Sequence, residues 1–88
     1  MLKGKTTSGF KFQIDETVAN DMELMEELAK ANTDTTVFPS VLERILGADQ
    51  KKALYDHLRT EDGRVPIDVC INEFAEIMTV AGEATKNS

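Results

Sequence analysis

The chain has 88 residues, enough for one domain of ordinary size. Sixteen acidic against ten basic side chains give a net charge of −6, which argues against a protein that binds nucleic acid or an anionic membrane by itself. The single cysteine argues against a disulfide-stabilised secreted domain, and no segment approaches the roughly 20 apolar residues of a membrane span. We therefore expect a protein of the reducing cytoplasm.

Residues 2–14 are expected to form a β-hairpin. Phe10, Phe12 and Ile14 alternate with polar residues, as on a strand with one buried face, and the turn residues Thr7-Ser8-Gly9 precede them. Because an isolated two-stranded hairpin is marginally stable in water, this apolar face must cover a helix or meet another subunit. The segment is also basic, since it carries no acid and three lysines, namely Lys3, Lys5 and Lys11.

The first helix is expected over residues 20–31, where the composition becomes acidic. Asn20 and Glu23 have the spacing of a capping box, and the polar run 32–36 ends the helix. The residues expected on its inward face are Met22, Met25, Leu28 and Ala29, with Leu24 beside them.

Two further helices are expected over residues 37–46 and 50–60. Gly47 suits the left-handed position after the first of them, and Asp49 can cap the second. The residues expected to face inward are Val37, Phe38, Val41, Leu42, Ile45 and Leu46 in the first, and Leu54, Tyr55 and Leu58 in the second.

The fourth helix is expected to begin near Pro66 and to end at Gly82, with residues 83–88 as a flexible tail. The fold class predicted is therefore mainly α (α+β), with an N-terminal hairpin and about four short helices in one compact domain of residues 1–82. The inward-facing residues of the last helix recur at steps of three and four, and they are Ile67, Cys70, Ile71, Phe74, Ile77, Met78 and Ala81.

No pattern in the sequence indicates catalysis. Nucleophilic catalysis needs a nucleophile and a base held together, and the chain has one histidine and one cysteine. His57 is expected on the solvent side of its helix and Cys70 on the apolar side of its own. We expect no catalytic residue and no enzyme.

Metal and cofactor sites are not expected either. One histidine and one cysteine cannot form a structural zinc site, and the five glycines are too scattered for a phosphate-binding loop. If Gly63 is aligned with the glycine of a calcium-binding loop, Leu58, Thr60 and Val69 fall at ligand positions, so that alignment fails as well.

Four segments are distinctive when they are read in chain order. They are Phe10–Asp15 with Asn20–Glu26, Val41–Gly47 with Gln50–Lys52, Leu58–Val65, and Glu73–Ile77 with the ending Lys86–Ser88. In this order, and with the acidic balance, the chain resembles the small tail assembly chaperones of long, non-contractile-tailed phages and prophages of Gram-positive bacteria. The resemblance covers nearly the whole chain.

The resemblance implies a non-enzymatic protein of the host cytoplasm that is not retained in the mature virion. Such a chaperone coats the helical tape-measure protein, keeps it soluble, and yields to the tail tube protein as the tail grows. The tape-measure protein is thus the implied partner and the tail tube protein a second one. A homo-oligomer built through the hairpin edges is a further expectation.

A chaperone of this kind needs an apolar surface, because a coiled-coil partner exposes apolar stripes before assembly. The hairpin face and the helix expected over residues 37–46 are the candidates. Phe10, Phe12 and Phe38 are the expected contact residues, and packing into the core is the competing interpretation of the same side chains.

Two other functions fit the size and composition. The first is a structural subunit of the tail or of the head-tail connector. The second is a small acidic inhibitor of a host DNA-binding protein, because residues 15–34 carry seven acids. The ending Thr85-Lys86-Asn87 also permits a slippery codon run and hence a frameshifted longer product, a hypothesis that an AAG codon at Lys86 would exclude.

Overall fold

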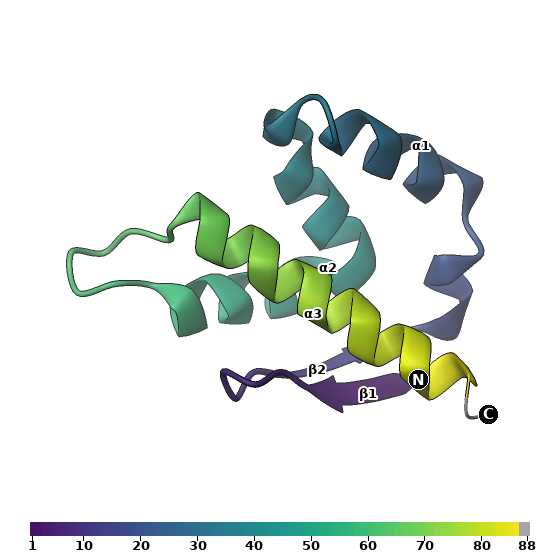
Figure 1. Ribbon diagram of the computed structural model, residues 1–88, viewed down its shortest axis with the longest axis horizontal. Helices are drawn as coiled ribbons and strands as arrows, with labels where there is room; N and C mark the ends of the chain where they lie inside the picture. The colour runs from purple at the N-terminus through teal and green to yellow at the C-terminus, as the bar shows by residue number, and fades with distance from the viewer. Residues whose placement is uncertain (87–88) are drawn as a thin grey trace.

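The computed structural model describes residues 1–86, and their N-terminal part is the hairpin that the sequence predicts (Figure 1). Strands β1 (Leu2–Lys5) and β2 (Lys11–Ile14) pair antiparallel, with Leu2 opposite Ile14. Gly9 has φ 95° in the turn, a conformation that strongly favours glycine, and its amide donates a 3.0 Å hydrogen bond to the carbonyl of Thr6.

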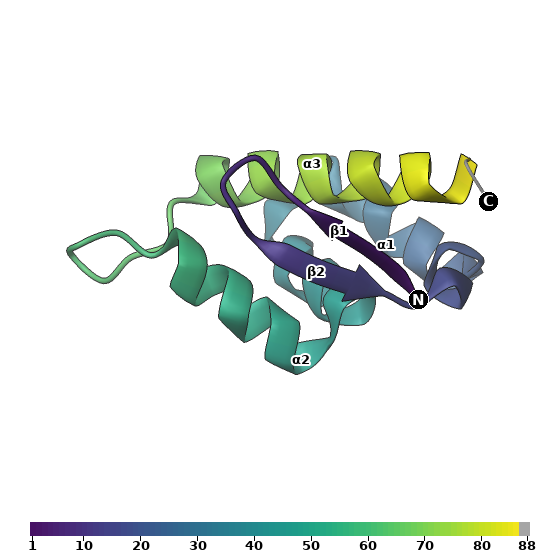
Figure 2. The same ribbon diagram turned by 90° about the horizontal axis from the view of Figure 1, so that it is seen from below.

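The apolar face of the hairpin packs on its own helices. Phe10, Phe12 and Ile14 are 6%, 4% and 5% exposed and belong to the core of the described residues. Figure 2 shows the hairpin lying across α3 and α2, with β1 nearer to α3. The period-two pattern thus correctly predicted the strand and its buried face.

Helix α1 covers Met22–Ala31 and differs from the expectation at its start. Asp21, and not Asn20, is the N-cap, because its carboxylate accepts the amide hydrogen of Glu23 at 2.9 Å. Asn20 instead ends the short 3-10 helix η1 (Glu16–Ala19).

The expected inward face of α1 is only partly right, because Ala29 and both methionines are exposed. Met22 and Met25 are 70% and 64% exposed, whereas Leu24 is buried and Leu28 half-buried. Two apolar stripes overlap in this sequence, and α1 packs on α2 through the leucine stripe. Glu27, one residue before Leu28, makes an ion pair on that side, as described below.

Helix α2 covers Phe38–Leu58 and follows the 3-10 helix η2 (Thr35–Val37). The backbone leaves the helical range at Gly47, where φ is 83° and ψ is 162°, so two helical segments meet at a kink there, as the sequence predicts. Taken together as α2, they leave three α-helices in the described residues, where about four were expected. The side chain of Gln50 donates to the carbonyl of Leu46 at the kink. The core residues of α2 are Val41, Leu42, Ile45, Leu46 and Leu54.

Helix α3 covers Ile67–Lys86 and continues past the expected end at Gly82. Gly82 does not adopt a positive φ, so nothing in the backbone stops the helix there. The first four residues of the expected tail 83–88 are therefore helical, and residues 87–88 lie outside the described ones. Ile67 is 72% exposed, contrary to expectation, while the buried residues of α3 include Cys70, Phe74, Ile77 and Ala81.

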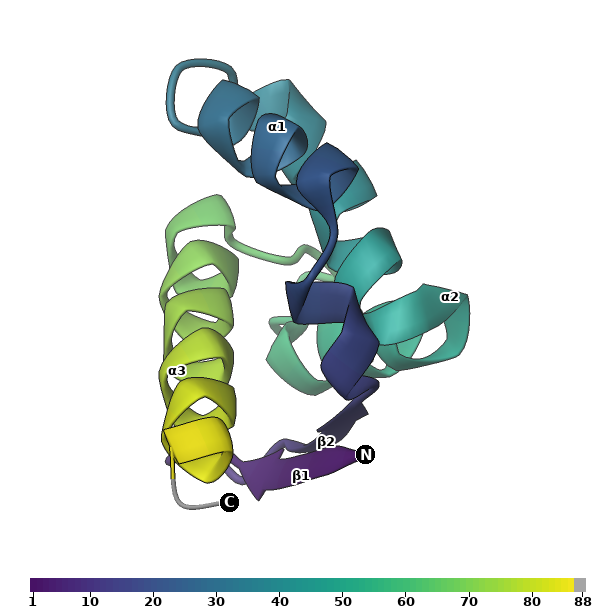
Figure 3. The ribbon, with the colours of Figure 1, turned by 90° about the vertical axis from the view of Figure 1, so that its right-hand side faces the viewer.

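The elements are arranged around one apolar core, with the hairpin and α1 at opposite ends of the molecule (Figure 3). Strand β1 packs on α3 so closely that a Cβ added to Gly4 would lie 2.6 Å from Cγ1 of Val80. The predicted class, mainly α with an N-terminal hairpin, is confirmed.

Candidate functional site

Two neighbouring hollows lie on either side of Phe38, where η2, α2 and α3 meet. Their volumes are about 420 and 410 Å³, and Thr35 and Phe38 line both of them. We call the two hollows together the Phe38 groove. The other apolar residues of its walls include Tyr55, Val65, Ile67 and Cys70 in the first hollow, and Leu28, Ile71, Phe74 and Met78 in the second.

Phe38 forms the ridge between the two hollows. Its ring meets the ring of Phe74 edge-on, with centroids 5.1 Å apart and planes at 89°, and the side chain stays half-buried. Of the three aromatic residues predicted as contacts, Phe38 therefore lies at an accessible surface. Phe10 and Phe12 belong to the core, so their rings are not presented to a partner in this structure.

The C-terminal end of α1 forms one wall of the groove. Leu28 and Asn32 line the second hollow, and Met25 lies seven residues before Asn32, hence only about 20° away around the helix. The exposed side chain of Met25 therefore lies on the same side of α1 as this wall, about two turns before it. Methionine is unbranched and polarizable, which suits it to contacts with varied apolar partners. At the other end of the groove, the exposed Ile67 lines the first hollow.

Electrostatically, the groove is nearly neutral. Burial raises the pKa of the phenol of Tyr55 and of the thiol of Cys70, and nearby acidic groups reinforce both shifts, so these two side chains are uncharged at neutral pH. Arg59 lines the first hollow, and its guanidinium already donates to the carbonyl of Gly63 at 2.8 Å and to Asp56 at 3.2 Å. Apolar contact is what this surface offers a ligand.

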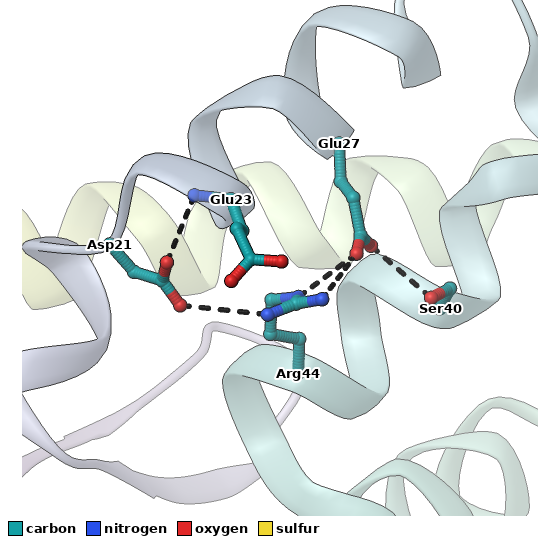
Figure 4. A network of polar contacts seen from close by, with 5 residues as sticks. All are labelled: Asp21, Glu23, Glu27, Ser40 and Arg44. Carbon is teal, nitrogen blue, oxygen red and sulfur yellow. Dashed lines mark hydrogen bonds and ion pairs between the residues drawn. The ribbon is translucent and has the colours of Figure 1, made fainter.

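A polar network holds the α1 wall in place (Figure 4). Arg44 on α2 donates to Oε1 of Glu27 on α1 from Nε at 3.0 Å and from Nη2 at 2.6 Å. Its Nη1 lies 3.6 Å from Asp21, the N-cap of α1, and Ser40 donates to Glu27 at 3.2 Å. Hydrogen bonding to Glu27 raises the pKa of Arg44, so the guanidinium stays charged. This network joins the N-cap of α1 and its Glu27 side to α2.

A second polar cluster joins the hairpin turn to α2 and α3. The hydroxyl of Ser8 donates to Oε2 of Glu73 at 2.6 Å and lies 3.0 Å from Nε2 of His57. Thr6 donates to the same oxygen of Glu73 at 2.7 Å. His57 is exposed, as expected, yet its ring centroid is 5.6 Å from that of Phe10. Sequence patterns give no signal for this cluster, because its members are far apart in the chain.

The cluster brings a hydroxyl, an imidazole and a carboxylate together, but the hydroxyl lies between the other two groups. In a catalytic triad the carboxylate orients the imidazole, which in turn contacts the hydroxyl. Here Glu73 contacts the hydroxyl of Ser8 directly, and two side-chain hydroxyls satisfy this buried carboxylate. The arrangement anchors the hairpin turn on α3.

In the described part of the chain, no group of three or more histidine, cysteine, aspartate or glutamate side chains is placed to hold a metal ion. None of the helices described is long and apolar enough to cross a membrane. Comparison with protein-family models, with curated proteins and with solved structures gives no match for this chain.

Proposed function

We propose that the protein is a non-enzymatic tail assembly chaperone that binds the tape-measure protein in the host cytoplasm and is not retained in the virion. The resemblance of four ordered sequence segments supports this function. The structural observation that carries it is the Phe38 groove, an apolar hollow surface with exposed methionine and isoleucine side chains beside it.

The form of the groove suits an amphipathic helix. In helix-in-groove recognition, apolar side chains three to four residues apart enter neighbouring hollows of the binding surface. The two hollows beside Phe38 offer two such positions, Ile67 lines the first of them, and the exposed Met25 lies on the same side of α1 as the second. A long helical protein with a repeated apolar stripe would bind many copies weakly, and the net charge of −6 per copy would keep the coated complexes apart.

Co-expression with the tape-measure protein tests the proposal. Met25→Gln and Ile67→Gln remove apolar contact at side chains that are 64% and 72% exposed, so neither change should impair folding. We expect both variants to leave more of the tape-measure protein insoluble. Val69→Gln is the matched control, because Val69 is exposed on α3 and lines neither hollow. If both groove variants keep the tape-measure protein fully soluble, the Phe38 groove is not its binding surface.

Two further measurements separate the other functions. Purified virions should lack the protein, whereas its presence there would indicate a structural subunit of the tail or connector. Binding should tolerate added salt because it depends on apolar contact. Salt-sensitive binding to a basic host protein would instead indicate the acidic inhibitor.

A further inference from the structure

The outer face of the hairpin presents three lysines to solvent. The register pairs Lys5 with Lys11 and Lys3 with Gln13, and these four residues are exposed, whereas their neighbours Phe12 and Ile14 point into the core. We call Lys3, Lys5 and Lys11 the lysine face. Figure 2 views the molecule from the side of this hairpin.

The ladder geometry brings two of these lysines together. The amide of Thr6 donates to the carbonyl of Phe10 at 2.9 Å, which makes Thr6 and Phe10 a hydrogen-bonded pair. Lys5 and Lys11, one step along, are then a non-hydrogen-bonded pair, the kind in which Cα atoms lie about 4.5 Å apart and side chains come closest. Like charges placed directly opposite each other destabilise a strand pair.

No acid of the described residues forms an ion pair with the lysine face. The ion pairs of the described residues lie elsewhere, and they join Met1 to Glu16, Arg44 to α1, Lys51 to Glu43 and Arg59 to Asp56. The two acids at the hairpin turn, Glu73 and Glu76, are occupied by the hydroxyls and the backbone of the turn. Among the side chains that the structure describes, the three hairpin lysines are therefore left without an ion-pair partner.

The face also carries a shallow, open depression, and the outer edge of β2 beside it is covered at Gln13. A hollow of about 560 Å³ is lined by the three lysines together with Gly4, Phe12, Gln13 and Gln50. Gln50 accepts from the amide of Gln13 at 2.8 Å and donates to its carbonyl at 2.7 Å, so its side chain takes the place of a strand there. A ligand at this face would meet ammonium groups rather than free backbone of Gln13.

We propose that the lysine face binds an acidic segment of a protein partner. Lys3 and Lys5 are two residues apart on one strand, about 7 Å, and carboxylates on alternate residues of an extended segment repeat at the same distance. A nucleic acid would be repelled by the acidic remainder of the chain. The hairpin and α1 lie at opposite ends of the molecule, so this surface is separate from the Phe38 groove and the proposal does not depend on the proposed function (Figure 3).

Fluorescence anisotropy with a labelled all-glutamate peptide tests the proposal on the full chain. We expect binding at low ionic strength that weakens with salt, and an affinity about tenfold lower or worse when Lys3, Lys5 and Lys11 are all changed to glutamine, because three modest ion pairs are lost together. The control changes Lys30, Lys52 and Arg64 to glutamine. These three side chains are exposed and make no ion pair in the described structure, and their substitution removes the same total charge.

The proposal is supported if the control triple variant binds like the original chain while the lysine-face variant does not, with unchanged thermal melting in both. An equal loss of peptide affinity in the two variants would show that only net charge matters, and it would overturn the proposal. Tighter binding of a single-stranded DNA of matched charge, or no binding of the peptide at all, would overturn it as well. The Ile67→Gln variant should bind the peptide normally, because Ile67 belongs to the Phe38 groove. The test of the lysine face is therefore independent of the test of the groove.

Discussion

The hydroxyl of Thr6 donates a 2.7 Å hydrogen bond to Oε2 of Glu73, which is 67 positions away in the sequence. Both side chains are buried, at 3% and 7% exposed. The same hydroxyl oxygen of Thr6 accepts the amide hydrogen of Phe10 at 3.1 Å, so one hydroxyl links the hairpin turn to α3. The packing of β1 on α3 is thereby fixed by a specific polar contact as well as by apolar burial.

Glu73→Ala should lower the free energy of unfolding by about 1–3 kcal/mol, because it leaves the hydroxyls of Thr6 and Ser8 without their acceptor. Urea denaturation followed by circular dichroism measures this loss. Glu76→Ala is the control, since its hydrogen bonds to Thr7 are exposed and their removal should cost less. Equal losses in the two variants would contradict the role given to the buried carboxylate.

Gly4→Ala should destabilise the protein by about 1–3 kcal/mol, as overpacking of a core does. The new Cβ would lie 2.6 Å from Cγ1 of Val80 and 2.7 Å from Cζ of Phe12, a ring that is buried and cannot move aside easily. Gly82→Ala is the matched comparison. It meets nothing within 4 Å inside α3 and should stabilise the helix by up to about 1 kcal/mol. Thermal melting of the two variants should shift in opposite directions.

Stability should fall in acid through the aspartates that cap turns and short helices. Hydrogen bonds from Thr36 lower the pKa of Asp34, and hydrogen bonds from Thr17 and Thr60 do the same for Asp15 and Asp62. A lowered pKa in the folded state stabilises the fold above the ordinary value of 3.8, and this stabilisation is lost as the pH falls through the folded-state pKa.

Urea midpoints measured from neutral pH downward test this dependence. Asp34→Asn keeps an oxygen that can accept from Thr36 but cannot titrate, so its midpoint should depend less on pH below the ordinary value than that of the original chain. Identical pH profiles for the two proteins would show that the capping of η2 by Asp34 does not contribute.

Arg44→Ala should loosen α1 more than it loosens the rest of the molecule. The guanidinium joins α2 to both Glu27 and the N-cap Asp21, and it is the main polar link between these helices in Figure 4. Hydrogen exchange should therefore accelerate in the amides of α1 while those of α3 stay protected. Lys52→Ala, at an exposed side chain without an ion pair, should leave both patterns unchanged.

The periodicity of the sequence correctly predicted those elements whose apolar residues fall on a single face. Alternation at Phe10, Phe12 and Ile14 leaves only one face to bury, and α3 repeats its apolar residues at steps of three and four over most of its length. Gly47 was correctly placed at a break in the helical backbone, because a positive φ strongly favours glycine. The end at Gly82 was wrong, since a glycine permits a helix to stop and does not require it.

Local sequence by itself thus determined the hairpin, its buried face and the helical character of the remainder. Which face of α1 is buried was decided only in the tertiary structure, because the methionine and leucine stripes are nearly equivalent in period and only packing on α2 distinguishes them; the ion pair from Arg44 to Glu27 lies on the side that is buried. That choice leaves Met25 exposed beside the Phe38 groove. The Thr6–Glu73 contact and the solitary lysine face likewise depend on which residues meet across the fold, since propensity and period describe neighbours in the chain and not neighbours in space.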